Sequence, residues 1–153
     1  MEVKPRSMKQ LGTHLVIDAW HCPAYLLNDP ERIRTAILDA VTAGEATLID
    51  FCVHQFSPHG VTATATLAES HIAIHTWPEY GYFAADLFFC GRGNPRKAAE
   101  HLETALQAGE VNRREFERGF EPSVSLDTSS VSVSETSPAT NLTAFPETSF
   151  AGR

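Results

Sequence analysis

The chain has few cysteines, no excess of positive charge and no long apolar run, and each of these excludes a class of protein. Its three cysteines, Cys22, Cys52 and Cys90, are odd in number and irregularly spaced, which fits neither a disulfide framework nor a paired C-x-x-C zinc site. A reducing, cytoplasmic setting is therefore expected. The formal net charge of -7 and the lack of a basic stripe argue against a nucleic-acid partner. No segment is long and apolar enough for a membrane span, and Met1–Gln10 has no signal-peptide core, so no membrane association is expected.

The composition suits one folded domain followed by a segment of a different kind. A length of 153 residues and a hydrophobic content of 42% are typical of a single core. From about Phe120 the sequence becomes rich in Ser and Thr and loses its periodicity. Such a segment buries too little apolar surface to offset its ordering entropy. We therefore predict a domain over residues 1–119 and a disordered extension over residues 120–153.

Alternation of apolar and polar residues predicts the strands. Strands are expected over residues 12–20, 46–56, 61–77 and 82–90, with a short one over residues 111–118. Asp29-Pro30 and Asn94-Pro95 are typical helix starts, and Gly44 and Gly109 are natural stops for the two amphipathic segments that follow them. Two helices and four or five strands predict an α+β fold, with the helices on one face of a mainly antiparallel sheet.

The second face of the predicted sheet is too aromatic to be left in water. Each strand has one nearly pure apolar face, which suits packing under helices. The opposite face mixes aromatic with polar and charged residues: His14, Asp18, Trp20, Asp50, His54, Phe56, Tyr82, Asp86, Phe88 and Cys90. The aromatics indicate that something covers this face, most simply a second copy of the chain. A homodimer is therefore expected, with two sheets enclosed between two helix layers.

The alternation changes parity inside the segment 61–77. The apolar positions are odd up to Leu67 and even from Ile72 onward. Because side chains alternate with a period of two, a regular strand cannot do this. A bulge or tight bend near residues 68–71 is the simple interpretation, and a backbone distorted in order to react is a second one. The two interpretations are compatible.

Glu69-Ser70 lies at this break, and a Glu-Ser pair can cleave itself. The serine hydroxyl attacks the preceding carbonyl and exchanges the amide for an ester. Loss of the serine α proton then expels the carboxylate, and the resulting dehydroalanine hydrolyses to a pyruvoyl group. This chemistry needs an oxyanion stabiliser and a base. His75 could be the base. Thr62, Thr64 and Thr66 share one strand face, and their hydroxyls could donate a hydrogen bond to the tetrahedral intermediate.

Taken singly, these residues have ordinary structural explanations. Thr62 suits a strand, His75 could be a satisfied hydrogen-bonding residue, and Cys90 could be a small buried apolar group.

Two motifs together carry a family resemblance. The run LAESHIAIHTWPEYGYFAADLFFCG over residues 67–91, with FSPHGV over residues 56–61, closely resembles the signature of the small prokaryotic S-adenosylmethionine decarboxylases. The resemblance extends from Leu11 to about Gly119. It implies self-cleavage between Glu69 and Ser70, which gives a beta chain of residues 1–69 and an alpha chain from residue 70. Ser70 would become a covalent pyruvoyl cofactor, and no metal is implied.

The resemblance also implies roles for other residues. His75 matches the histidine that assists processing, Cys90 matches the proton donor in decarboxylation, and Thr62 is the hydroxyl that supports processing. Phe56 and Trp77 match aromatics that sandwich the adenine of the substrate, and Glu79 matches a carboxylate that holds the ribose. In the family the two aromatics come from different protomers, which implies a dimer of cleaved alpha–beta pairs.

The implied function is decarboxylation of S-adenosylmethionine to the aminopropyl donor of spermidine biosynthesis. The pyruvoyl group would hold the substrate amine as a Schiff base and act as the electron sink. One departure is Thr62-Ala63, where family members usually have Ser-Gly. The hydroxyl is kept, but the added methyl groups put the rate of processing in question.

Three alternatives stay open at this point. A metal site could use His54, His59, His71, His75 and Cys90, although their spacing matches no helical or knuckle pattern. The chain could be an uncleaved, non-catalytic dimer that binds adenosyl ligands. It could also be a pyruvoyl decarboxylase that acts on another amino acid, such as arginine.

Overall fold

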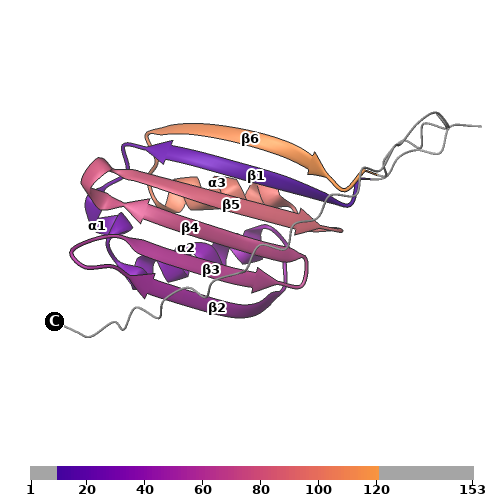
Figure 1. Ribbon diagram of the computed structural model, residues 1–153, viewed down its shortest axis with the longest axis horizontal. Coiled ribbons are helices and arrows are strands. Elements are labelled where there is room, and N and C mark those ends of the chain that lie inside the picture. The colour runs from indigo at the N-terminus through magenta and orange to yellow at the C-terminus, as the bar shows by residue number, and fades with distance from the viewer. Residues whose placement is uncertain (1–9, 121–153) are drawn as a thin grey trace, which may run out of the picture. The chain divides into compact units, whose positions relative to one another are not determined.

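The computed structural model describes residues 10–120, which form one antiparallel six-stranded sheet with α2 and α3 packed on one face (Figure 1). The elements in chain order are β1 (Gly12–Trp20), α1 (Ala24–Leu27), α2 (Pro30–Ala43), β2 (Leu48–Gln55), β3 (Val61–Leu67), β4 (Ser70–Trp77), the 3-10 helix η1 (Pro78–Tyr80), β5 (Tyr82–Cys90), α3 (Pro95–Ala105) and β6 (Glu110–Arg118). Across the sheet the strands follow the order β2-β3-β4-β5-β1-β6. The predicted α+β class is therefore confirmed. The predicted extension lies outside the described residues, except for Phe120.

The prediction of four or five strands was wrong, because the sheet has six. The segment 61–77 is a hairpin of two strands, β3 and β4, and not one broken strand. β6 is a full strand of nine residues although it lacks apolar alternation. Its helix-side charges are neutralised by α3: Arg113 reaches Glu103 at 2.6 Å, and Glu115 accepts from Arg96 at 2.6 Å and 2.8 Å. On this strand, ion pairs with α3 therefore stand beside a single hydrophobic contact, that of Val111 with the core.

The two predicted helix starts are confirmed. The Asp29 carboxylate accepts hydrogen bonds from the backbone N–H groups of Glu31 and Arg32, and Pro30 occupies the first helical turn. Asn94 caps α3 in the same way through the N–H of Lys97. These caps satisfy donors that have no partner inside the helix.

The core lies between the helices and the sheet face that they cover. Its sheet residues are Leu15, Ile17, Val61, Ala63, Ala65, Leu67, Ile72, Ile74, Phe83, Ala85, Leu87 and Phe89. Ile72 and Ile74 have no exposed surface, and burial of such a side chain contributes about 1.5–3 kcal/mol. The change of parity near residue 69 therefore keeps the apolar positions of both β3 and β4 on the core side.

We call the other side of the sheet the open face. It carries His14, Val16, Asp18, Trp20, Asp50, Cys52, His54, Thr62, Thr64, Thr66, His71, Ala73, His75, Trp77, Tyr82, Ala84, Asp86, Phe88, Cys90, Asn112, Arg114, Phe116 and Arg118. In Figure 1 the strands lie in front of α2 and α3, so the view looks onto this face. Within residues 10–120, no helix is long and apolar enough to cross a membrane.

Candidate active site

Ser70 is the first residue of β4 and follows a two-residue turn. Leu67 pairs with Ser70, so Ala68 and Glu69 form the turn of the β3–β4 hairpin. The turn is tied to the segment before β2: Ala68 donates to the carbonyl of Thr47 at 2.9 Å, and the Glu69 carboxylate accepts from the N–H of Thr47 at 2.9 Å. That second hydrogen bond lowers the pKa of Glu69. The predicted tight bend is thus a hairpin turn anchored from outside.

The backbone of Ser70 is strained. Its φ of 148° falls in a region that L residues rarely adopt and that glycine occupies freely. The other non-glycine residues with positive φ in the described part of the chain, His21, Glu45 and Gln107, have φ between 53° and 61°, the ordinary left-handed region. Such an outlier costs on the order of 1–3 kcal/mol. The Glu69–Ser70 peptide therefore leads into a residue held in an unfavourable conformation.

The carbonyl of Glu69 is already bound by a backbone donor. It accepts a hydrogen bond from the N–H of Cys90 at 2.8 Å. A donor in this position stabilises negative charge on the carbonyl oxygen when a nucleophile adds to its carbon. The Cys90 residue is half-buried at the end of β5, and its thiol is free. Thus one residue supplies both a backbone donor to Glu69 and the thiol that the sequence singled out.

The hydroxyl of Ser70 approaches an imidazole that was not among the predicted catalytic residues. Ser70 Oγ lies 3.5 Å from Nδ1 of His71. Strand alternation hides such a pair, because adjacent side chains in a regular strand point to opposite faces. The backbone N–H of Cys90 was missed for another reason: a main-chain donor leaves no mark in a sequence.

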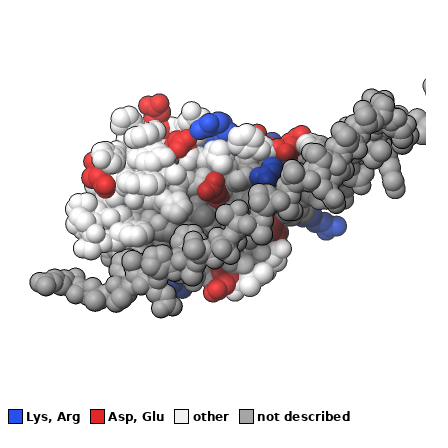
Figure 2. All heavy atoms as spheres, viewed as in Figure 1, with Lys and Arg blue, Asp and Glu red and all other residues white. Residues whose placement is uncertain are grey.

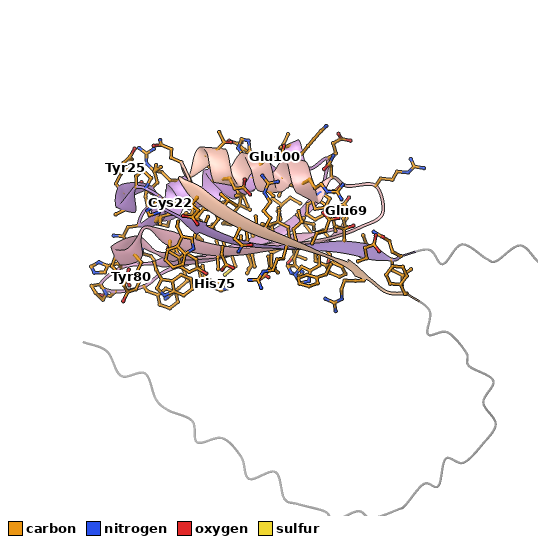
Figure 3. All side chains as sticks on the ribbon, turned by 90° about the horizontal axis from the view of Figure 1, so that it is seen from above. Cys22, Tyr25, Glu69, His75, Tyr80 and Glu100 are labelled. Carbon is orange, nitrogen blue, oxygen red and sulfur yellow. The ribbon has the colours of Figure 1, made fainter. Side chains whose placement is uncertain are left out.

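His75 and Thr62 form a pair of their own on the open face. They are opposite each other on β4 and β3, and Thr62 Oγ1 lies 2.9 Å from Nδ1 of His75. At about 3.3 Å per residue, five residues of strand separate His75 from Ser70 by roughly 16 Å. Figure 3 shows His75 on the side away from the helices, with Glu69 displaced from it along the strands. One chain alone therefore does not bring His75 and Thr62 to Ser70.

The predicted substrate-binding aromatics are exposed at the same end of the sheet. Trp77, the last residue of β4, is 39% exposed, and Phe56, which directly follows β2, is 50% exposed; β3 lies between these two strands. The Trp77 ring lies 5.2 Å from the Tyr82 ring, which stacks on Trp20 at 4.2 Å. Trp77 thus belongs to a row of three aromatic rings on the open face.

A partly buried hydrogen bond holds the middle ring of this row. The Tyr82 hydroxyl donates to Asp18 at 2.6 Å, and Arg114 contacts the same carboxylate at 3.1 Å. The hydrogen bond from Tyr82 lowers the pKa of Asp18. Burial, together with Asp18, raises the pKa of Tyr82 to about 12. Tyr82 therefore stays protonated and keeps donating at any ordinary pH.

Glu79 lies outside the sheet, on η1. It lines a pocket of about 300 Å³ together with Ala24, Tyr25, Asn28, His59 and Pro78. Within residues 10–120, no group of three or more His, Cys, Asp or Glu side chains is placed to hold a metal ion.

The geometry defines a class of protein: an α+β enzyme in which a strained serine follows a carbonyl that a backbone amide already holds. The chain belongs to the S-adenosylmethionine decarboxylase family, whose model matches residues 13–119.

Curated relatives are similar over most of their length. The S-adenosylmethionine decarboxylase proenzyme of Thermotoga maritima is 44% identical over 113 residues, which cover 73% of this chain and 87% of that protein. The proenzyme of Methanococcus maripaludis is 43% identical over 114 residues, covering 74% and 93%. The crystal structure of the Aquifex aeolicus adenosylmethionine decarboxylase superposes with a TM-score of 0.71 at 34% identity, covering 75% of this chain and 96% of that one.

Proposed function

We propose that the chain decarboxylates S-adenosylmethionine with a pyruvoyl group made from its own Ser70, as the names of its relatives suggest. The observation that carries the proposal is the hairpin turn at Glu69-Ser70, where a strained serine follows a carbonyl bound by the N–H of Cys90. The decarboxylated product would supply aminopropyl groups for spermidine. When formed, the pyruvoyl group supplies an electron sink for the departing carboxylate.

The first step of self-cleavage fits the residues of one chain. The Ser70 oxygen adds to the carbonyl carbon of Glu69, and the N–H of Cys90 holds the oxygen that becomes negative. Collapse of this intermediate breaks the C–N bond and leaves an ester. Release of the strained φ of Ser70 favours the same direction.

The second step needs a base for the α proton of Ser70, and the base that the family resemblance implies, His75, does not lie near Ser70 within one chain. The ester breaks down when the α proton of Ser70 is removed, and His75 lies roughly 16 Å away along β4. Two chains packed open face to open face would bring Thr62 and His75 of the partner subunit to Ser70. The site is then built from two protomers: Ser70 and Cys90 from one, and the Thr62–His75 pair from the other.

The open face supports this dimer. Trp20, Trp77 and Phe116 are 42%, 39% and 48% exposed in the single chain. In Figure 2, uncharged side chains make up most of the visible part of this face, with charged ones scattered among them. A large aromatic surface with few charges is typical of a protein interface. We therefore propose a homodimer of cleaved pairs, in which two helix layers enclose two sheets.

Substrate recognition is assigned to the exposed residues near Trp77. Phe56 and Trp77 would stack on the adenine, Glu79 would accept hydrogen bonds from the ribose hydroxyls, and the cationic sulfonium suits nearby aromatic faces. The Cys90 thiol would protonate the substrate carbon after carbon dioxide leaves. The cysteines of the described chain are all free, which is compatible with the proposed reducing, cytoplasmic setting.

The Thr62-Ala63 departure does not remove the hydroxyl from its place. Thr62 Oγ1 remains within 2.9 Å of His75, and Ala63 is buried on the core side of β3. The extra methyl of Ala63 therefore packs against the helices and not into the site. This supports a processing-competent chain over the uncleaved binding module.

Intact mass spectrometry of the purified protein tests the proposal. We expect two fragments, residues 1–69 and 70–153, with a blocked N-terminus on the second, and a single uncleaved chain for Ser70→Ala. Thr104→Ala, which removes an exposed hydroxyl on α3, is the control and should be cleaved. Release of labelled carbon dioxide from S-adenosylmethionine but not arginine should accompany cleavage. An unbroken wild-type chain would favour the binding module, and release from arginine alone would reassign the substrate.

A further inference from the structure

We propose that His71 is the base for the first step of self-cleavage: it takes the proton of the Ser70 hydroxyl and returns it to the departing amide nitrogen. This inference rests on the proposed function. It divides the reaction between two imidazoles. His71 would make the ester within one chain, and the partner's His75 would break it down.

The contact that supports this role is specific. Within residues 10–120, His71 is the one titratable side chain that forms a hydrogen-bond contact with the Ser70 hydroxyl, at 3.5 Å from Oγ to Nδ1. Catalytic hydrogen bonds are commonly long in a resting site and shorten as the reaction proceeds.

The strain at Ser70 has a consequence for this contact. In a regular strand Ser70 and His71 would point to opposite faces of the sheet. Ser70 pairs with Leu67 and Phe89, both on the core side, whereas His71 pairs with Thr66 and Phe88 on the open face. With its φ of 148°, Ser70 departs from that regular geometry and its hydroxyl stays within reach of the next side chain.

Neighbouring side chains hold the His71 ring in place. It packs edge-on against Phe88 at 6.1 Å and lies 6.4 Å from the ring of His14. His14 is held in turn by Arg118, whose guanidinium lies 3.2 Å from His14 Nδ1, and its Nε2 lies 3.6 Å from Asp86. The imidazole is thus positioned by packing across β1, β4, β5 and β6, so little orientation has to be gained when the reaction begins.

The proton balance closes without any other reactant. The O–H bond of Ser70 breaks as Oγ bonds to the carbonyl carbon of Glu69, and the proton moves to Nδ1 of His71. The N–H of Cys90 holds the oxygen of the tetrahedral intermediate. The C–N bond then breaks, its electron pair stays on the Ser70 nitrogen, and the proton passes from Nδ1 to that nitrogen. The products are an ester and an amine, and His71 is unchanged.

The two histidines should leave different precursors when they are removed. His71→Ala should stop at the intact amide, whereas His75→Ala should stop at the ester. Hydroxylamine cleaves esters and leaves amides intact, so it separates the two cases. A general base contributes about 10²–10⁴-fold to a rate. We therefore expect cleavage of His71→Ala to be slower by about 10²-fold or more.

The experiment follows full-length chains after a pulse of cell-free synthesis, with intact mass as the readout and hydroxylamine added to half of each sample. His71→Ala should give an uncleaved, hydroxylamine-resistant chain, and added imidazole should restore cleavage. His71→Gln keeps the size and polarity but not the basicity, and it should be as slow as His71→Ala. The control is His101→Ala on α3, whose nearest acidic partner is Asp39 at 3.9 Å; it should cleave normally.

The possible outcomes are distinct. Imidazole rescue shows that the His71→Ala chain is folded and lacks only the base, which supports the inference. Cleavage of either His71 variant at the wild-type rate would overturn it, as would accumulation of a hydroxylamine-sensitive ester in His71→Ala. Failure of the proposed function gives another pattern, because the wild-type chain itself would then stay uncleaved.

Discussion

At the scale of single residues, the decisive feature is a serine in a backbone conformation that suits glycine. The strain at Ser70 is stored in the uncleaved chain and disappears when the preceding bond breaks. It therefore acts on the reaction by raising the free energy of the starting state.

Comparison of two uncleavable chains measures this strain. Ser70→Gly removes the Cβ that makes a φ of 148° unfavourable, whereas Ser70→Ala keeps it. Relief of strain should outweigh the greater backbone entropy of unfolded glycine, so we expect Ser70→Gly to unfold with a free energy higher by about 1 kcal/mol. Urea denaturation of both variants at one protein concentration gives the difference. A less stable Ser70→Gly would mean that the backbone at this position is not strained in solution.

The sequence predicts some residues of the site and misses others, for physical reasons. Ser70 stands out because it follows Glu69 where the alternation breaks, and the family resemblance, now confirmed by the family match, gives it a role. His71 does not stand out, since alternation assigns it to the other face. The N–H of Cys90 and the anchor at Thr47 are main-chain groups, and every residue except proline has one.

At the scale of secondary structure, cross-strand contacts on the open face order the aromatic row. Tyr82 stands between Trp20 and Trp77, and its hydroxyl is tied to Asp18 on β1. A cross-strand pair of this kind typically contributes about 0.2–1 kcal/mol, and more where a charge accepts the hydrogen bond.

Removal of the Tyr82 hydroxyl should therefore destabilise the protein in a pH-dependent way. The pKa of Asp18 is lowered from 3.8 in the fold, so its hydrogen bond stabilises above pH 3.8 and this stability is lost as pH falls through the lower, folded value. Since the Asp18 side chain is 34% exposed, solvent screens part of the effect. In the Ser70→Ala background, we expect Tyr82→Phe to lower the unfolding free energy by about 1 kcal/mol at pH 7 and by less at pH 3.

Urea denaturation at the two pH values checks this prediction. Tyr80→Phe is the matched control, because Tyr80 is 69% exposed and its loss of a hydroxyl should change little at either pH. An equal loss of stability for Tyr82→Phe at pH 7 and pH 3 would show that the hydroxyl does not act through the ionised Asp18.

The elements show what periodicity can and cannot predict. The capping residues and the apolar stripes in the sequence predicted where α2 and α3 begin, because local chemistry determines the start of a helix. β6 was expected only as a short strand over residues 111–118, and its charged residues Arg113 and Glu115 occupy core-side positions. Those positions become favourable only next to α3, and a tertiary contact of that kind is absent from any local window of sequence.

At the scale of the whole molecule, the separation of His75 from Ser70 makes the proposed enzyme depend on its dimer. The homodimer stays a prediction, but it has a direct genetic test. A Ser70→Ala chain still carries Thr62 and His75, and a His75→Ala chain still carries Ser70, His71 and Cys90. A mixed dimer would therefore contain one complete site.

Co-expression of these two inactive chains, with different tags, should restore cleavage of the His75→Ala chain and leave the Ser70→Ala chain intact. With random pairing, about half of the His75→Ala chains meet the right partner. Mass spectrometry of doubly purified mixed dimers gives the result. Mixed dimers in which no chain is cleaved would show that His75 acts within its own chain and would contradict the shared site.

The strand order has one more consequence if the hairpin turn is cut. Residues 1–69 provide β2, β3 and β1, and the remainder provides β4, β5 and β6, so the sheet order β2-β3-β4-β5-β1-β6 interleaves the two polypeptides. β1 would lie trapped between two strands of the other piece. The two polypeptides could then separate only if the whole sheet unfolded. Refolding after thermal unfolding would require two separate chains to associate in solution. Cleavage that leaves the native fold intact would thus make thermal unfolding irreversible at low protein concentration.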